Sequence, residues 1–254
     1  MAQIIAIANQ KGGVGKTTTA VNLAASLAAA EKRTLLVDLD PQANATSGVG
    51  IDIHDLQETV YHALLGDTAA ADVLQQTALA PLHLLPANPD LIGAEVELIS
   101  ALARESKLKT ALRGVVEEYD YILIDCPPSL GLLTINALTA AHAVLIPLQC
   151  EYYAMEGLSQ LMNTIRLIQK ELNPALVIRG ILLTMFDSRN NLSHQVSEEI
   201  RQHFSAKVFQ AVIPRNVRLS EAPSHGLPAL LYDISSSGAA AYLALAREII
   251  RTEP

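Results

Sequence analysis

Short apolar runs alternate along this chain with longer segments of helical character. Seven of the runs are brief and continuously apolar, which is typical of strands buried on both faces of a parallel sheet. The predicted strands are residues 4–8, 34–38, 82–86, 121–125, 143–147, 177–184 and 208–213. The predicted helices are residues 16–30, 95–118, 132–140, 157–172, 192–204 and 237–251.

This order of elements predicts an α/β fold, in which helices flank a doubly wound, mostly parallel sheet. A chain of 254 residues, of which 50% are hydrophobic, is long and apolar enough to bury such a sheet. No repeat, low-complexity tract or interdomain linker interrupts the pattern, so we expect residues 1–254 to form a single domain. The pattern is least definite in residues 48–80.

Charge is distributed unevenly along the chain. The formal net charge of -8 by itself argues against a general nucleic-acid-binding protein. Residues 166–220 nevertheless contain eight Lys or Arg and four acidic residues, which gives this window +4 and leaves -12 for the remainder. The total charge is therefore compatible with a basic face on an acidic protein.

The strongest chemical signal follows the first predicted strand, where residues 11–18 read Lys-Gly-Gly-Val-Gly-Lys-Thr-Thr and an Ala/Leu-rich helix begins. This is the context of a P-loop, whose glycines let backbone N–H groups turn toward phosphates at the positive end of a helix. We expect Lys16 to neutralise the β- and γ-phosphates of a nucleotide and the Thr17 hydroxyl to ligate Mg2+. The predicted nucleotide-binding residues of the loop are Lys11, Gly12, Gly13, Val14, Gly15, Lys16, Thr17 and Thr18.

The loop departs from the strict P-loop pattern at its start. Gln10 stands where the first glycine belongs, and Lys11 adds a second lysine that would crowd Lys16 if both served the same phosphates. The sequence here resembles the deviant Walker A motif, K-G-G-x-G-K-[ST]. That resemblance implies that Lys11 reaches across a dimer to the partner's nucleotide, as an arginine finger does when it is supplied in trans.

Two acidic motifs follow later strands. Residues 37–42 read Val-Asp-Leu-Asp-Pro-Gln, and strand alternation places Asp38 and Asp40 on the same side, beyond the carboxyl end of the strand. The strand at 121–125 ends on Asp125, the Walker B pattern of an apolar strand that closes on a carboxylate. We expect Asp125 to reach Mg2+ directly or through water, and Asp38 to support the metal or the loop, or else only to cap the strand.

Two cysteines, Cys126 and Cys150, are too few for a disulfide framework or a four-thiolate metal site. Cys126 adjoins Asp125, near the position at which related iron–sulfur reductases hold a cluster shared by two subunits. Such a cluster needs two suitably placed thiols in each chain, and Cys150 follows the next strand. We therefore interpret both cysteines as reduced structural thiols.

The first residues run directly into a strand and a glycine loop without a basic leader, which predicts no signal peptide. No apolar run reaches the roughly 18 residues that a membrane-spanning helix needs. We therefore expect a cytoplasmic protein that does not bind membranes.

Taken together, the motifs resemble the ParA/Soj partition ATPases over essentially the whole chain. Besides the loop, the resemblance rests on Asp-Pro-Gln-Ala-Asn at residues 40–44 and Asp-Cys-Pro-Pro-Ser at residues 125–129. The stretch Ile-Pro-Arg-Asn-Val-Arg-Leu-Ser-Glu-Ala-Pro-Ser at residues 213–224 is typical of the chromosomal, Soj-like branch.

This resemblance implies an activity cycle with ATP and Mg2+ as cofactors. ATP drives formation of a homodimer, and the dimer binds double-stranded DNA without sequence preference. A ParB-type centromere-binding protein stimulates the weak intrinsic hydrolysis of ATP, after which the monomer leaves the DNA. Such a protein segregates or positions chromosome or plasmid DNA and is associated with the nucleoid.

The resemblance also assigns roles to individual residues. Asp40 orients the attacking water, which makes Lys11, Lys16 and Asp40 the expected catalytic residues. The expected DNA-binding residues are Arg189 and Arg218, both of which lie in the +4 window. The expected lining of the adenine pocket is Pro214, Arg215 and Asn216.

Three alternatives stay open. A membrane-cycling ATPase of the MinD type needs a basic amphipathic C-terminal helix, but residues 241–254 hold two arginines against two glutamates. An ATPase that positions another cargo by the same DNA tracking differs only in its partner. A metal-cluster reductase or carrier is disfavoured by the cysteine count.

Overall fold

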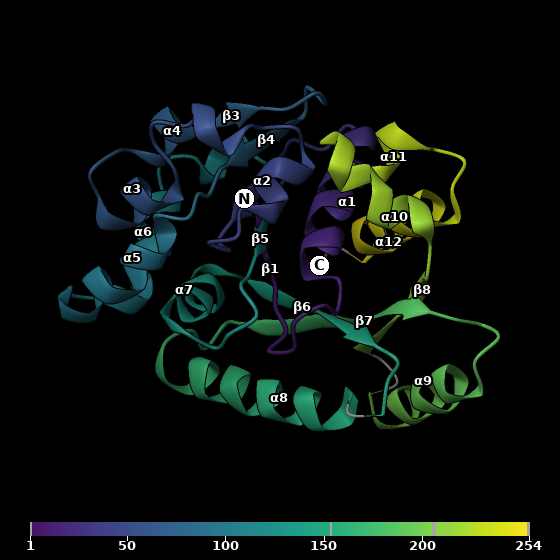
Figure 1. Ribbon diagram of the computed structural model, residues 1–254. Coiled ribbons are helices and arrows are strands. Elements are labelled where there is room, and N and C mark those ends of the chain that lie inside the picture. Colours follow the sequence, from purple (N-terminus) through teal and green to yellow (C-terminus); the bar gives the residue numbers. More distant parts are fainter. Residues whose placement is uncertain (1, 153, 205–206, 253–254) are drawn as a thin grey trace.

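The computed structural model describes residues 2–152, 154–204 and 207–252, and an eight-stranded sheet forms its centre (Figure 1). The strands lie in the order β3-β4-β2-β5-β1-β6-β7-β8. Every neighbouring pair is parallel except β3 and β4, which are antiparallel. The bounds are β1 (Gln3–Ile7), β2 (Thr34–Asp38), β3 (Gln75–Gln76), β4 (Leu82–Leu85), β5 (Tyr121–Asp125), β6 (Ala143–Gln149), β7 (Val177–Phe186) and β8 (Val208–Pro214).

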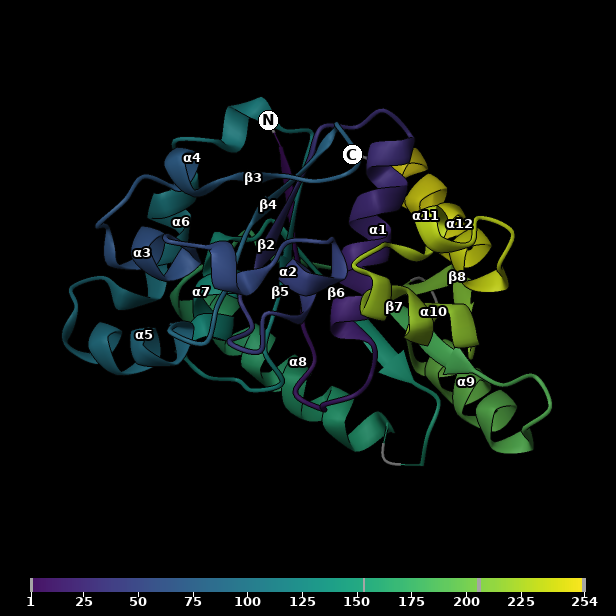
Figure 2. The same cartoon turned by 45° about the horizontal axis from the view of Figure 1, so that its top comes forward.

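Helices cover both faces of the sheet, which creates two layers of apolar core (Figures 1 and 2). On one face α1 (Lys16–Ala29) packs beside α12 (Ser237–Arg251). The other face is covered by several helices, including α7 (Leu132–Ala140), α8 (Ala154–Glu171) and α9 (Asn191–Phe204). The shorter helices are α2 (Asn44–Gly48), α3 (Val60–Leu65), α4 (Ala70–Val73), α5 (Leu91–Glu97), α6 (Lys107–Leu112), α10 (Val217–Glu221) and α11 (Ala229–Tyr232).

The predicted fold class is confirmed. All seven predicted strands occur, with ends that differ from the prediction by at most two residues, and five of the six predicted helices occur to within three residues. The small elements between residues 44 and 76, which the pattern did not predict, include the two-residue strand β3. Its antiparallel pairing with β4 makes the sheet mostly rather than wholly parallel.

The predicted helix at residues 95–118 is wrong. The chain there forms α5, α6 and short 3-10 turns, and Ala103 has a left-handed backbone with φ 50° that a right-handed helix cannot contain. Asn136 on α7 explains the break, because its buried side chain donates to the Arg104 carbonyl (2.8 Å) and accepts from the Leu108 N–H (3.1 Å). Local helix propensity is therefore overruled by a distant hydrogen-bonding side chain.

The parallel strands all end at one edge of the sheet, and the order of strands reverses around β1. In open α/β sheets, ligands bind at this edge, next to the strand where the order reverses. The predicted nucleotide-binding and carboxylate residues lie at the ends of β2, β5 and β8 and in the segments that follow β1, β2 and β8, so the topology brings them together.

Asn173, which follows α8, fastens the end of α7. Its buried side-chain amide donates to the carbonyl oxygens of Leu138 (2.9 Å), Thr139 (3.3 Å) and Ala141 (2.7 Å). These carbonyls lie at a helix end, where the helix itself supplies no donors. The side chain therefore satisfies backbone groups that burial would otherwise leave unpaired.

We predict that Asn173→Ala lowers the free energy of unfolding by about 2 kcal/mol, since the buried carbonyls lose their donor. Urea unfolding followed by circular dichroism measures the change. The matched control is Asn163→Ala on the exposed face of α8, where the side chain bonds only to Arg166 among the described contacts. Equal stability of the two variants would contradict the capping role.

Candidate functional site

The loop between β1 and α1 has the backbone that a phosphate cradle needs. Gly13 (φ 73°) and Gly15 (φ 85°) are left-handed, a conformation that glycine adopts without strain. Gly15 is the N-cap residue of α1, and no side chain caps the helix, so its first N–H groups remain available to an anion. The carbonyl of buried Val14 accepts a hydrogen bond from the Thr184 hydroxyl (2.8 Å), which fastens the loop to β7.

Lys16 lies inside the site. Its side chain is 6% exposed, and its ammonium donates to the Lys11 carbonyl (3.1 Å). Burial lowers the pKa of Lys16, while the charges of Asp125 and Asp40 oppose that change. An ammonium that is mostly withdrawn from water and held above the glycine loop is suited to a multiply charged phosphate.

Lys11 points elsewhere. Its ammonium forms an ion pair with the carboxylate of Glu151, which lies between β6 and α8, and both side chains are about half exposed. Its backbone N–H donates to the Asn9 side chain (3.0 Å), and Asn9 in turn donates to the Pro147 carbonyl (2.7 Å). The two lysines of the loop therefore have different surroundings, one buried at the cradle and one at the surface.

Asp38 and Asp40 are closely linked but differ in their environment. Both carboxylate oxygens of the fully buried Asp38 are used, by the Asp40 N–H (3.1 Å) and by the N–H and hydroxyl of Thr46 on α2 (2.8 and 2.7 Å). Burial raises the pKa of Asp38 to about 6. Asp40 accepts from the Gln42 N–H (2.9 Å) and lines the cavity. This bonding favours a loop-supporting role for Asp38 over direct metal ligation.

Asp125, at the end of β5, is the least satisfied polar group in the site. Its side chain is fully buried, and neither carboxylate oxygen has a hydrogen-bond partner among the described residues. Burial raises the pKa of Asp125 well above its usual range and the Asp38 charge adds to this, while the nearby Thr17 hydroxyl and Lys16 ammonium oppose it. Buried, unpaired carboxylate oxygens beside a hydroxyl form a donor set that suits Mg2+.

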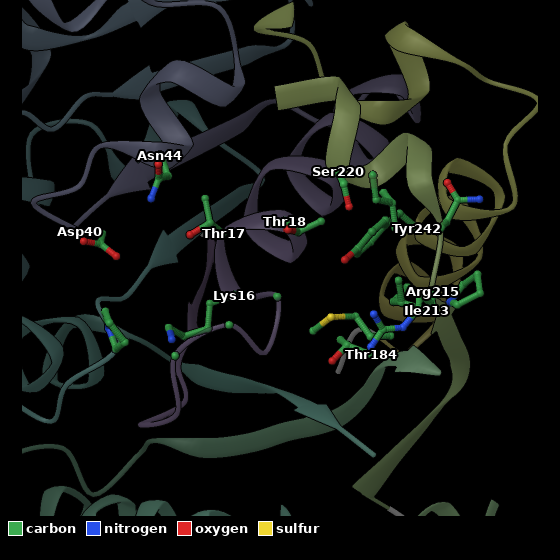
Figure 3. Close-up of a pocket in the computed structure, with 18 of the residues that line it drawn as sticks. Lys16, Thr17, Thr18, Asp40, Asn44, Thr184, Ile213, Arg215, Ser220 and Tyr242 are labelled. Carbon is green, nitrogen blue, oxygen red and sulfur yellow. The ribbon is translucent and has the colours of Figure 1, made fainter. Parts of the chain in front are cut away.

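A cavity of about 430 Å³ joins the glycine loop to the segment after β8. Figure 3 shows Lys16 and Asp40 at one end of it and Ile213, Arg215 and Tyr242 at the other. Pro214, Arg215 and Asn216, which the resemblance assigns to the adenine pocket, line the second end of the cavity. The side-chain oxygen of Asn216 also caps α10 by accepting from the Arg218 N–H (3.0 Å).

Three residues that line or flank the site were missed by the sequence reasoning. Tyr242 comes from the C-terminal helix α12, and its hydroxyl lies 3.1 Å from that of Thr19. Thr184 comes from β7, and Glu151 is the ion-pair partner of Lys11. No motif surrounds Tyr242 or Thr184. The sequence offered no specific signal for Glu151 either, because an exposed lysine is solvated by water and does not require an acidic partner.

The structure does not bring the two predicted DNA-binding arginines into the cavity. Arg189 precedes α9 and forms a two-pronged pair with Asp187 through its Nε (3.0 Å) and Nη2 (2.9 Å). This pairing lowers the pKa of Asp187 to about 2. Arg218 on α10 pairs with Glu221 (2.7 Å) and Asp233 (3.3 Å). Both guanidinium groups are exposed to solvent, but each already has an acidic partner.

The cysteines lie apart in the fold. Cys126 follows β5 and Cys150 follows β6, and β1 separates these two strands. Burial raises the pKa of the Cys150 thiol to about 11, and it also raises that of Cys126. In the part of the chain that the structure describes, no three His, Cys, Asp or Glu side chains gather to hold a metal. None of its helices has the length and apolar character to cross a bilayer.

This fold and this loop define the chain as a nucleotide-binding α/β protein of the P-loop class. A sequence model of the AAA domain matches residues 2–178. The chain is 62% identical over 251 residues to the chromosome partitioning protein ParA of Myxococcus xanthus (strain DK1622), covering 99% of this chain and 89% of that protein. It is 60% identical over 249 residues to the sporulation initiation inhibitor protein Soj of Bacillus subtilis (strain 168), covering 98% of both chains.

The chain therefore belongs to the ParA/Soj family of chromosome partitioning ATPases. Among solved structures, it is similar to a cobyrinic acid a,c-diamide synthase from Mycobacterium smegmatis with a bound ATP analogue and magnesium. The TM-score is 0.87 at 41% identity, covering 99% of this chain and 95% of that one.

We predict that Asp38 makes stability fall as pH rises through about 6 when nucleotide and Mg2+ are absent. Its raised pKa means that the folded state holds a proton that the unfolded state has already lost. The contribution of protonated Asp38 to the free energy of unfolding is complete below about pH 4 and lost above about pH 7. It is on the order of 2 to 3 kcal/mol in total. Urea unfolding of Asp38→Asn across this range measures it.

The variant is expected to lose less stability than the native chain over the same pH interval. Asp55→Asn, at an exposed aspartate, is the control for the loss of a carboxylate. Identical pH profiles of native chain and Asp38→Asn would rule out a buried proton at this position.

Proposed function

We propose that this chain is an ATP-driven switch that partitions DNA. It binds ATP with Mg2+, dimerises, binds double-stranded DNA non-specifically as the dimer, and hydrolyses ATP when a ParB-type protein stimulates it. The observation that carries the proposal is the division between the two loop lysines: Lys16 is buried at the cradle, whereas Lys11 stands at the surface. The proposed unit is one domain of residues 1–254, in the cytoplasm and on the nucleoid.

The nucleotide's phosphates would lie on the glycine loop, among the N–H groups that begin α1, with Lys16 supplying the main positive charge. The base would occupy the other end of the cavity, beside Pro214, Arg215 and Asn216. The proposed Mg2+ site consists of Thr17 and Asp125, with Asp38 holding the loop around it. Mg2+ would neutralise charge on the β- and γ-phosphates.

Asp40 is proposed to orient the attacking water. Its carboxylate lines the phosphate end of the cavity. One carboxylate oxygen accepts the hydrogen bond from the Gln42 N–H, and the other would bind the water. A carboxylate that only positions water is a weak base, which is consistent with slow intrinsic hydrolysis.

Lys11 would complete the site of a second subunit. To do so it must leave Glu151, and an ion pair this exposed contributes only about 0 to 1 kcal/mol. A triphosphate offers a higher charge than one carboxylate, so ATP in a facing subunit can attract this ammonium. ATP then serves both as the substrate and as part of the dimer interface.

DNA binding is proposed to depend on Arg189 and Arg218 in both subunits. Each arginine must exchange a carboxylate partner for a phosphate, so one subunit alone gains little from the contact. Dimerisation doubles the number of contacts on one DNA molecule and so raises the affinity by multivalency.

The architecture of α12 favours this proposal over a MinD-like membrane switch. The apolar face of α12, which includes Tyr242, Leu245 and Ile249, is buried in the core. A helix that binds a membrane surface must instead present such a face to lipid. Residues 253–254, the end of the tail considered above, lie outside the described residues. Positioning of another cargo differs from DNA partitioning only in the partner that recognises the dimer.

We predict that Asp40→Ala with ATP and Mg2+ elutes as a dimer from a size-exclusion column with light-scattering detection. The variant keeps the phosphate cradle and loses only the residue that orients water, so the ATP-bound dimer accumulates. Hydrolysis, followed as released phosphate, is expected to fall by about 100-fold or more.

Two second-site variants serve as controls for this dimer. Lys16→Ala in the Asp40→Ala background is expected to lose ATP binding, and Lys11→Ala is expected to keep ATP binding but remain monomeric. A dimer that survives removal of Lys11 would refute the proposed role in trans.

We predict that Arg189→Ala and Arg218→Ala each weaken binding of the ATP-loaded dimer to DNA of any sequence. Each lost phosphate contact reduces the slope of log affinity against log salt by about 1. Fluorescence anisotropy with two unrelated duplexes over a salt series measures both quantities. Arg113→Ala removes an exposed arginine directly after α6, which lies on the other side of the molecule from α9 and α10 (Figures 1 and 2), and is expected to bind like the native chain. Unchanged affinity at low salt in the Arg189 and Arg218 variants would exclude them as contacts.

A further inference from the structure

Thr46, on the short helix α2, takes part in three buried hydrogen bonds. Its side chain is completely buried. Both its hydroxyl (2.7 Å) and its backbone N–H (2.8 Å) donate to Oδ2 of Asp38. The hydroxyl oxygen also accepts from the N–H of Ala87, two residues after β4 (3.0 Å). Because the hydroxyl donates to one partner and accepts from another, its orientation is determined by both.

Asp38 connects Thr46 to Asp40. The second oxygen of the Asp38 carboxylate, Oδ1, accepts from the Asp40 N–H (3.1 Å). Asp38 belongs to β2 and is fully buried, so its hydrogen bonds do not compete with water. One carboxylate thus joins α2 to the residue that we propose to orient the attacking water.

The turn between Asp40 and α2 has a backbone that needs such support. Ala43, the buried N-cap residue of α2, is left-handed, with φ 52° and ψ 32°. Alanine seldom adopts this conformation and keeps it only where the surrounding structure imposes it. The Ala43 N–H donates to the Asp40 carbonyl (2.9 Å), so the strained turn folds back on Asp40 itself. The anchor at Thr46 opposes release of this turn.

The start of α2 lies beside the phosphate end of the cavity. Asn44, the first residue of α2, lines the cavity together with Asp40. Figure 3 shows both side chains near Thr17. Thr46 is not among the residues that line the cavity, so it affects a bound nucleotide only through its neighbours. A shift of about 1 Å in a group that orients a reactant is enough to slow a reaction severely.

We propose that Thr46 is a positioning residue for ATP hydrolysis: by holding Asp38 it keeps the Asp40 carboxylate where the attacking water binds. The effect on hydrolysis rests on the function proposed above, whereas the immobilisation of the loop does not. Loss of the Thr46 hydroxyl should slow the chemical step and spare ATP binding and dimerisation. The reason is that the glycine loop, Lys16 and Lys11 keep all their contacts.

The first test is Thr46→Val, which keeps the shape of the side chain and removes the hydroxyl. Single-turnover hydrolysis of γ-labelled ATP is expected to slow by about tenfold or more. The Kd for ATP and the ATP-dependent dimer, measured by size exclusion, are expected to stay native. Thr46→Ser restores the hydroxyl and is expected to restore the rate.

The matched control is Thr139→Val on α7. Thr139 is also buried, and its hydroxyl donates to the Ile135 carbonyl (2.7 Å), away from the nucleotide site. This variant is expected to hydrolyse ATP at the native rate. A native rate in Thr46→Val, or a loss of ATP affinity as its only effect, overturns the positioning role.

A double-mutant cycle separates positioning from a general loss of structure. If Thr46 acts through Asp40, Thr46→Val should cause no further slowing in the Asp40→Ala background. An equal fold loss of rate in both backgrounds would show that Thr46 acts by another route, and it would refute the proposal.

Hydrogen exchange in the nucleotide-free chain tests the loop without reference to hydrolysis. The amides of Asp40, Gln42 and Ala43 each donate a hydrogen bond within this loop. Their exchange is expected to be about tenfold faster in Thr46→Val than in the native chain or in Thr139→Val. Unchanged protection contradicts the anchor. Failure of the proposed function shows separately, as a native chain that neither hydrolyses ATP nor dimerises while the difference in exchange persists.

Asp38→Asn is a second variant for the same test. Its side-chain amide has one acceptor oxygen in place of two, so it cannot accept from both Asp40 and Thr46. Exchange in the loop is expected to quicken as it does in Thr46→Val. If neither variant folds, as judged by circular dichroism, the hydrogen bonds hold the domain rather than the loop, which also overturns the proposal.

Discussion

The fully buried carboxyl group of Asp125, for which the described residues supply no well-formed hydrogen bond, stands at the centre of the nucleotide site. It ends β5 beside β1, where the strand order reverses, and Lys16 lies near it as a buried ammonium. Isolated buried charges cost free energy unless a partner compensates them. The fold therefore places a buried ammonium near a buried carboxyl group whose pKa is raised, an arrangement that a metal ion and a polyphosphate would complete.

Several hydrogen bonds hold the loops that surround these buried groups in place. Thr184 fastens the glycine loop to β7, and Thr46 holds Asp38, which in turn holds the backbone at Asp40. These bonds are backbone-directed or buried, so they resist exchange with water. The interior of the site is thus preorganised.

The exposed cations behave differently from the buried one. Lys11, Arg189 and Arg218 each pair with an acidic neighbour near the surface. Exposed pairs of this kind are weak and easily exchanged, whereas a phosphate offers the same geometry with more charge. The chain therefore keeps its surface cations compensated until a more highly charged partner replaces the carboxylates.

The sequence by itself determined the α/β class, the position of nearly every strand, and the glycine loop with Lys16, because apolar periodicity and glycine's left-handed freedom act over a few residues. It failed at residues 95–118, where Asn136 captures the backbone around Ala103, and it gave no sign of Tyr242 or Thr184 in the cavity. Only the tertiary structure decided these features, and with them the pairing of Lys11 with Glu151. Such contacts join residues far apart in the chain, and their energy depends on distances that no local pattern encodes.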